Sequence, residues 1–100
     1  MLERDIENRL RQPIRQLGGL CLKLVCPGFI GVPDRLILLP GGRVVFVELK
    51  APGKKECPRQ VYVHGLLRRL GFTVFSSVDS ATAISAVVNY CRRLVYGDGV

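Results

Sequence analysis

Apolar residues along this chain follow two kinds of spacing, and each kind predicts a different element. Spacing of three and four residues is typical of helices, whereas short apolar runs bounded by glycine or proline are typical of strands. Helices are expected at 2–17, 58–70 and about 80–96. Strands are expected at 20–26, 36–39, 44–49 and 72–77. Because a helix connects the third and fourth strands, the pattern predicts an α/β fold with a mixed central sheet of about four strands flanked by helices.

The two outer helices each carry one apolar stripe. The stripe is Leu2, Ile6, Leu10, Ile14 and Leu17 in the first helix, and Ile84, Val87, Val88, Cys91 and Leu94 in the last. Gly18-Gly19 is expected to end the first helix, and Pro13 inside it is expected to kink or split it. Asp79 or Ser80 is expected to cap the last helix, and Pro58 to start the middle one.

Pro40-Gly41-Gly42 separates two apolar runs and is expected to form the turn of a hairpin. If Leu39 pairs with Arg43 across this turn, the antiparallel register places Asp34 opposite Glu48. Directly opposed residues share one face, with Cβ atoms about 4.5–5.5 Å apart. Residues two apart on a strand also share a face. Lys50, two residues after Glu48, therefore shares its face. Asp34, Glu48 and Lys50 are expected to converge at one end of the hairpin.

This cluster suggests chemistry that an ordinary strand face does not need. Glu-x-Lys is common on solvated strands, but Glu48 follows the apolar run 44–47, which is typical of a strand buried on both faces. A buried carboxylate needs a partner, and Asp34 has the wrong sign unless a cation is present. Mg²⁺ or Mn²⁺, which prefers oxygen ligands, is therefore expected there, with the backbone carbonyl of Leu49 as a further ligand. Lys50 would steer a metal-activated water or stabilise charge on a phosphate.

Several segments, in this order, resemble the VRR-NUC family of the PD-(D/E)xK nuclease superfamily. The matching segments are 31–34 (GVPD), 42–53 (GRVVFVELKAPG), 57–60 (CPRQ) and 63–71 (VHGLLRRLG), with a similar glutamate-bearing start at 2–7 (LERDIE). The resemblance covers nearly the whole chain and implies a restriction-endonuclease-like core. It is greatest to small, stand-alone members of the kind that phages and mobile elements encode.

The resemblance also implies roles for individual side chains. The two carboxylates of the hairpin would be metal ligands, and the lysine would be catalytic. Gln60 would lie next to the active site on the following helix. Glu3 is the best match to a helical glutamate that approaches the metal, and Glu7, one helical turn later, is the alternative. The implied catalytic set is Asp34, Glu48, Lys50, Gln60 and Glu3.

The activity that the resemblance implies is that of a Mg²⁺- or Mn²⁺-dependent DNA endonuclease that hydrolyses phosphodiester bonds. The expected substrate is branched or structured DNA, such as a four-way Holliday junction. Three alternatives stay open. They are a DNA-binding module with a vestigial metal site, a nuclease subunit that is inactive without a partner, and a flap or non-specific nuclease.

Length and composition limit the expected number of domains and the oligomeric state. The 100 residues are expected to form a single nuclease domain, 1–100. The apolar fraction of 48% is high for so small a surface, so part of this area is expected to be interface rather than core. A homodimer is therefore expected, and it would present two active sites to a two-fold symmetric substrate.

The net charge of +7 favours a polyanionic partner such as DNA. Lys54, Lys55 and Arg59 are closest in sequence to the expected site. They are expected to contact DNA phosphates, which positions DNA without reading its sequence.

Three further residues have more than one interpretation. His64, the only histidine, falls one turn after Gln60 on the same helix face. It is either a general base or a packing or surface residue, and the second interpretation is favoured. Phe29 and Ile30 either wedge against DNA bases or pack under their loop, and packing is favoured.

The cysteines and the absence of targeting segments indicate the compartment. Four cysteines without C-x-x-C spacing make a zinc site unexpected, and most of them are expected to be small buried apolar residues. No secretory signal and no apolar segment of membrane length is present. A cytoplasmic protein with reduced thiols and no membrane contact is therefore expected.

Overall fold

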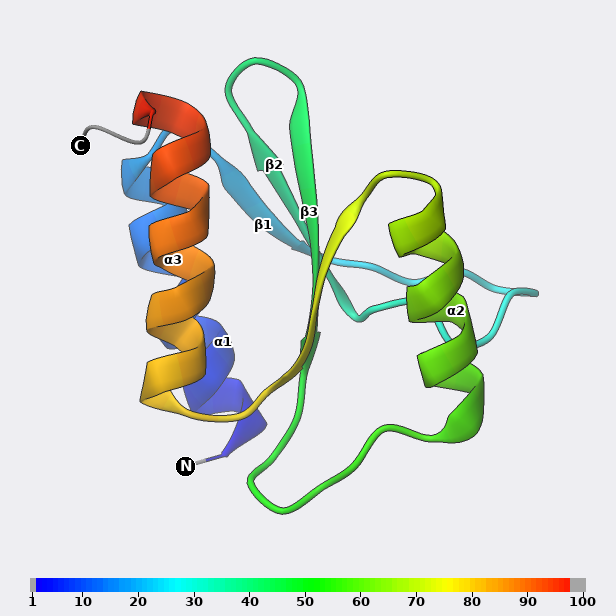
Figure 1. The fold of residues 1–100 in the computed structure, drawn as a ribbon. Helices are drawn as coiled ribbons and strands as arrows, with labels where there is room; N and C mark the ends of the chain where they lie inside the picture. The colour runs from blue at the N-terminus through cyan, green and yellow to red at the C-terminus, as the bar shows by residue number, and fades with distance from the viewer. Residues whose placement is uncertain (1, 98–100) are drawn as a thin grey trace.

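The structure, a computed structural model that describes residues 2–97, is built on one mixed sheet of four strands (Figure 1). The strands are β1 (Leu20–Lys23), β2 (Arg35–Leu39), β3 (Arg43–Leu49) and β4 (Thr73–Val78). The helices are α1 (Glu3–Gln16), α2 (Pro58–Arg69) and α3 (Ala81–Tyr96). The order along the chain is α1, β1, β2, β3, α2, β4, α3, which confirms the expected α/β fold.

The strand order in the sheet is β1-β2-β3-β4. The first two pairings are antiparallel, and β4 lies parallel to β3 because α2 carries the chain back across the sheet. Leu39 pairs with Arg43, as predicted. Gly41 and Gly42 adopt φ angles of 84° and 73°, a left-handed conformation that explains why the turn uses glycine at both positions.

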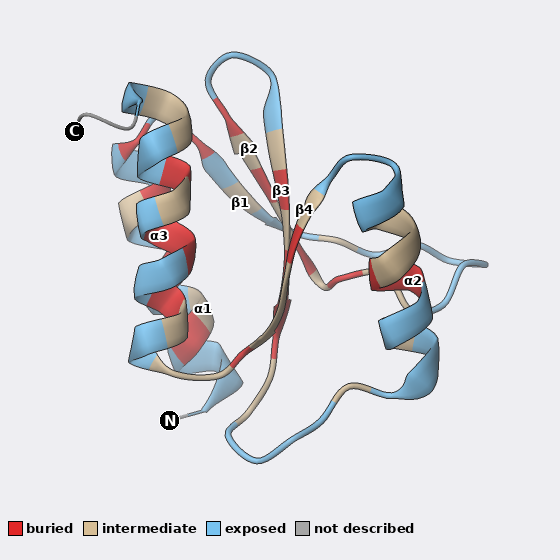
Figure 2. Ribbon diagram, in the orientation of Figure 1, coloured by how far each residue is buried: buried red, intermediate tan, exposed pale blue. Residues whose placement is uncertain are grey.

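The two faces of the sheet are covered unequally. Figure 1 shows α1 and α3 side by side on one face and α2 on the other. The apolar core lies under α1 and α3, where one stripe from each helix meets alternate residues of β2 and β3 (Figure 2). Its fully buried members include Ile6, Leu10, Ile14, Ile37, Val45, Val47, Val87 and Cys91.

The helix ends follow the sequence signals with one exception. Ser80 caps α3 by accepting a hydrogen bond from the Ala83 amide at 3.1 Å, so Ser80 rather than Asp79 is the cap. Helix α1 continues through Pro13 to Gln16, so the expected split does not occur. Leu10 and Ile14 are fully buried beside this proline, and their packing offsets the backbone hydrogen bond that proline removes.

Two other expectations are wrong. Strand β1 ends at Lys23, three residues early, and Val25 and Cys26 are exposed in the loop that follows. Only Cys91 is a buried cysteine, whereas Cys57 is also exposed and Cys21 is half-buried. All four are free thiols. No helix within residues 2–97 has the length and apolarity needed to cross a membrane.

Candidate active site

The hairpin of β2 and β3 brings Asp34 and Glu48 together at the end remote from its turn. The antiparallel register runs as far as Arg35 opposite Val47, so its continuation places Asp34 opposite Glu48. An Asp34 Oδ1 oxygen accepts a hydrogen bond from the Leu49 amide at 3.0 Å, which fixes this carboxylate against β3. Glu48 is 4% exposed, so β3 ends with a carboxylate inside the protein, as the apolar run before it predicted.

The electrostatics of this pair are unfavourable for two ionised carboxylates. Burial, together with the neighbouring Asp34 charge, raises the pKa of Glu48 to about 7, although Lys50 opposes the shift. Burial also raises the pKa of Asp34, against the lowering effect of its hydrogen bond from Leu49. The charge of Lys50 therefore does not offset the cost of ionising both carboxylates, and a bound cation would reduce that cost.

Lys50 and Gln60 form the next part of the cluster. The Lys50 ammonium lies 3.6 Å from Glu48 Oε2 and donates a hydrogen bond to Gln60 Oε1 at 3.0 Å. The same Gln60 oxygen accepts a hydrogen bond from the Cys57 amide at 3.1 Å, which caps the start of α2. Gln60 thus links the first turn of α2 to the lysine, in agreement with its expected place beside the site.

A β-bulge lies opposite Glu48. Between the pairs Val47 with Phe75 and Leu49 with Val78, β4 contains one residue more than β3. Ser77 within this bulge has a φ of 57°, which residues other than glycine rarely adopt. Bulges often redirect side chains next to active sites. Here the bulge accompanies Ser76, whose hydroxyl lies within hydrogen-bonding distance of His64, 2.8 Å from Nδ1.

His64 is fully buried between this bulge and Glu48. Its Nδ1 atom is 2.7 Å from Glu56 Oε2, and its Nε2 atom is 3.7 Å from Glu48 Oε1. Burial lowers the pKa of His64, although Glu56 opposes the shift. The favoured interpretation of His64 as a packing residue agrees with its full burial, and its contacts place it directly behind Glu48.

The two candidate glutamates of α1 have different surroundings. Glu7 Oε2 accepts a hydrogen bond from Arg35 Nη2 at 2.8 Å, and Arg35 Nη1 is 3.6 Å from Asp34 Oδ2. Glu7 is thus occupied by an arginine. Glu3 is close enough to Asp34 to raise the pKa of that carboxyl, behind the larger effect of burial. The geometry therefore favours Glu3 over Glu7 as the side chain that approaches the two carboxylates.

The donors present fit a magnesium-like ion with few protein ligands. Within residues 2–97, no group of three or more His, Cys, Asp or Glu side chains is arranged to hold a metal. Mg²⁺, however, is commonly bound by only one or two carboxylates and keeps several waters. Glu48 Oε1 is buried and accepts no hydrogen bond in the described part of the protein, and the nearest charged group given for it, His64 Nε2, is 3.7 Å away, so this oxygen is free to bind a metal. The chemistry of this oxygen pair suits a hard divalent cation.

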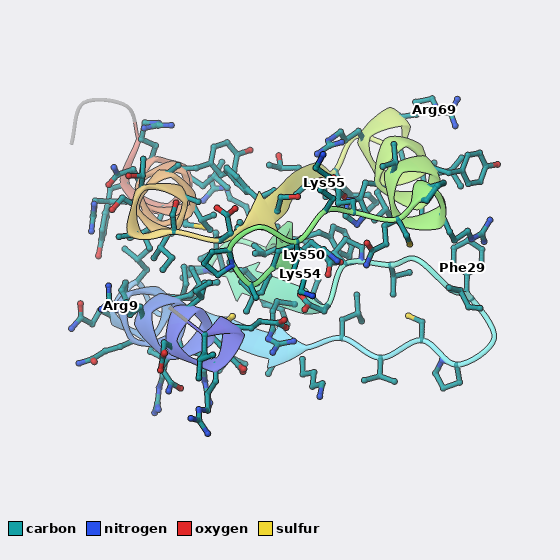
Figure 3. All side chains as sticks on the ribbon, turned by 90° about the horizontal axis from the view of Figure 1, so that it is seen from below. Arg9, Phe29, Lys50, Lys54, Lys55 and Arg69 are labelled. Carbon is teal, nitrogen blue, oxygen red and sulfur yellow. The ribbon has the colours of Figure 1, made fainter. Side chains whose placement is uncertain are left out.

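The expected phosphate-binding residues lie on two neighbouring segments, the loop between β3 and α2 and the start of α2. Lys54 and Lys55 are exposed in the loop between β3 and α2, and Figure 3 shows them in the central region that also contains Lys50. Arg59 is exposed on the first turn of α2, but its guanidinium is stacked between Phe29 and Tyr62. Arg59 therefore has a structural contact that the sequence did not indicate.

Sequence reasoning missed Glu56 and Ser76. Glu56 follows two lysines in a loop, a setting that is typical of a solvated charge. Ser76 lies in a strand that contains two other hydroxyl residues, Thr73 and Ser77, so nothing in the sequence distinguishes it as the partner of a buried histidine. Only the position of His64 one turn after Gln60 pointed toward this part of the site.

Comparison with known proteins finds similar proteins, two of which are described here, while no family model matches the chain. A protein of Acyrthosiphon pisum secondary endosymbiont phage 1, named "Putative nuclease p44", is 45% identical over 87 residues, which cover 85% of this chain and 94% of that protein. A solved structure described as a VRR_NUC domain superposes with a TM-score of 0.79 at 31% identity, covering 88% of this chain and 95% of the other.

Proposed function

This chain belongs to the VRR-NUC nuclease domain family, and from that premise we propose that it is a metal-dependent DNA endonuclease. The observation that carries the proposal is the buried Glu48 carboxylate, which lies beside Asp34 with an unpartnered oxygen and a Lys50 ammonium 3.6 Å away. Arg35 and Lys50 lie near this pair, yet the pKa of each carboxyl stays raised, so the site favours a further cation. A metal-dependent phosphodiester hydrolase uses carboxylates of this kind to hold its metal.

In this proposal, Asp34 and Glu48 hold Mg²⁺ or Mn²⁺, with the Leu49 carbonyl as a further ligand and Glu3 close to Asp34. When bound, the ion would polarise a phosphoryl oxygen and lower the pKa of a water molecule. The hydrogen bond from the Leu49 amide keeps Asp34 in place before the ion arrives. Preorganised ligands of this kind reduce the cost of assembling the site.

Lys50 supplies positive charge where the attacked phosphate would lie. Its ammonium is held by Gln60, so the charge is oriented rather than free in solution. Such a fixed charge stabilises the extra negative charge of the phosphate in the transition state and orients the attacking water. Gln60 acts through Lys50 and is therefore a positioning residue.

Lys54 and Lys55 are proposed to contact the DNA backbone on the exposed loop next to the site. A basic protein of charge +7 attracts DNA over a distance set by salt, and these contacts do not depend on sequence. The proposed substrate is branched or structured DNA. The support for this is the small size of the domain together with the proposed dimer described next.

We expect a homodimer to form through the bare sheet face. We define this face as Leu20, Leu22, Leu36 and Leu38, the leucines of β1 and β2 on the side opposite the core. Leu20 and Leu22 are 53% and 42% exposed, because α2 packs over β4 and leaves this half of the sheet uncovered. A second copy with the same apolar face would bury these side chains, since a two-fold contact uses one patch twice.

The proposed activity is tested with purified protein on labelled DNA. Four-way junctions, flaps, linear duplexes and single strands are incubated with Mg²⁺, Mn²⁺ or EDTA. We expect cleavage with either metal, none with EDTA, and paired symmetric cuts in the four-way junction. DNA binding without cleavage of any substrate would contradict the endonuclease and favour a binding module or a subunit that needs a partner.

Charged substitutions in the bare sheet face test the proposed dimer. Leu20→Glu with Leu22→Glu places like charges opposite each other and is expected to weaken association by roughly 100-fold or more, giving a monomer. Sedimentation equilibrium measures this directly. Leu70→Glu, at an exposed leucine beyond the end of α2, is the matched control and should remain dimeric. A wild-type protein that is monomeric at all concentrations tested would contradict the dimer.

A further inference from the structure

Arg59, Phe29 and Tyr62 form a stacked group at the surface. The Arg59 guanidinium carbon lies 5.0 Å from the centre of the Phe29 ring and 5.5 Å from that of the Tyr62 ring. Both distances are within the range of a cation–π contact. We call this group the aromatic platform. Its members come from the loop between β1 and β2 and from α2, two segments far apart in the sequence.

The loop is fixed to α2 at the platform. Arg59 Nε donates a hydrogen bond to the Ile30 carbonyl at 2.9 Å. A Cβ atom added at Gly31 would lie 2.9 Å from the Arg59 carbonyl oxygen and 2.9 Å from Val63 Cγ2, so only glycine permits this approach. The φ of Gly31, 102°, also requires glycine. The platform is thus held in one arrangement before any ligand binds.

The aromatic side chains stay accessible despite these contacts. Phe29 is 46% exposed, Tyr62 is 54% exposed and Ile30, beside them, is 76% exposed. The expected packing of Phe29 and Ile30 under their loop is therefore wrong for Ile30 and only partial for Phe29. Figure 3 shows Phe29 near the tip of the loop, on the α2 side of the molecule and away from Arg9 on α1. These rings contribute nothing to the apolar core, which lies on the opposite face of the sheet.

The platform adjoins the proposed active site. Arg59 precedes Gln60, and Gln60 holds the Lys50 ammonium. The loop that carries Phe29 leads into Asp34 and β2. One side of the platform is therefore connected to the lysine and the other to a proposed metal ligand. The platform and the proposed site are thus joined through two segments, the start of α2 and the loop between β1 and β2.

We propose that the aromatic platform binds an unpaired nucleobase by stacking; this inference rests on the proposed function. Aromatic rings and arginine planes stack on bases of any sequence, and the arginine adds attraction to the negative backbone. Bases at fully paired positions are covered by their neighbours, so the platform discriminates between paired DNA and DNA with a base freed at a branch, bulge or flap. It is a specificity determinant of the nuclease and not part of its reacting groups.

The test compares two DNAs of equal length, one fully paired and one with a single unpaired 2-aminopurine, whose fluorescence falls when it stacks. Binding is measured by anisotropy with Ca²⁺ in place of Mg²⁺, so cleavage is not needed. Wild type is expected to quench the fluorescence and to prefer the DNA with the unpaired base. Phe29→Leu with Tyr62→Leu should reduce that preference roughly tenfold and abolish quenching, with binding to paired DNA changed less than twofold. Leu70→Ala, at an exposed leucine remote from the platform, is the control and should behave as wild type.

The outcomes separate this inference from the proposed function. Cleavage by wild type without quenching, or an unchanged preference in the double variant, would overturn the platform alone. If wild type quenches the fluorescence, the double variant does not, and no DNA is cleaved, the platform is supported and the endonuclease proposal is contradicted. Absence of binding to any DNA would overturn both. If the double variant instead changes from dimer to monomer with its base preference intact, the rings contact a second copy and the platform is again overturned.

Discussion

Glu48→Gln and Lys50→Met are each expected to reduce the rate of DNA cleavage by about a thousandfold or more, with little change in DNA binding. Glutamine keeps the shape of the buried side chain but loses the charge proposed to hold the metal. Methionine keeps the length of the lysine but removes the ammonium that Gln60 orients. Removal of one group that stabilises transition-state charge commonly costs about 10²–10³ in rate, and loss of a metal ligand adds the loss of the ion.

Three measurements make this result specific. Single-turnover cleavage gives the rate, anisotropy gives the affinity for DNA, and thermal unfolding shows that each variant folds. Lys23→Met, which removes an exposed lysine of β1, is the matched control and should cleave as wild type does. Lys54→Ala should weaken binding and reduce its salt dependence without the same loss of rate. If Glu48→Gln keeps more than a tenth of the wild-type rate, the proposed role of Glu48 as a metal ligand is contradicted.

Without divalent metal, Glu48 is expected to make the protein less stable as the pH rises from about 4.5 to about 7. Its pKa is raised from an ordinary value of 4.5 to about 7 by burial and by Asp34, so the folded state binds more protons than the unfolded state in this window. Stability therefore falls with rising pH. The full penalty is present above pH 7 and is on the order of 3 kcal/mol, or roughly 15 °C in Tm.

Glu48→Gln isolates this effect from the other titrating groups. The pKa of His64 is lowered by burial, so His64 destabilises the fold as the pH falls below about 6.5, which opposes the trend due to Glu48. The comparison is the difference in Tm between wild type and Glu48→Gln, in EDTA, at pH 5 and pH 8. We expect the variant to gain stability relative to wild type at pH 8, and saturating Mg²⁺ to stabilise wild type alone. Equal pH dependence in the two proteins would contradict the prediction.

The sequence predicted the hairpin well because local rules determine it. Two glycines after Pro40 specify a tight turn, and the turn length fixes which residues oppose each other. The opposition of Asp34 and Glu48 then follows by counting. The buried position of Glu48 follows from the apolar run before it. No long-range information was needed for any of these steps.

The parts that were missed depend on contacts between distant segments. Glu3 and Glu7 are one helical turn apart, so the spacing alone does not choose between them, and the choice depends on Arg35, 28 residues after Glu7. The His64 contact with Ser76 depends on an extra residue in β4, which strict strand alternation does not predict. Cysteine burial was overestimated because local apolarity does not show which apolar segments remain in loops.

The unequal cover of the two sheet faces separates what keeps this protein folded from what it recognises. Substitutions in the layer of α1 and α3 alter the apolar core and therefore change the free energy of unfolding. Phe29, Ile30 and Tyr62 belong to the opposite side and are exposed. The surface beside the site is therefore free to diversify under selection while the scaffold stays constant. A library that randomises these three positions should yield folded variants with altered substrate choice.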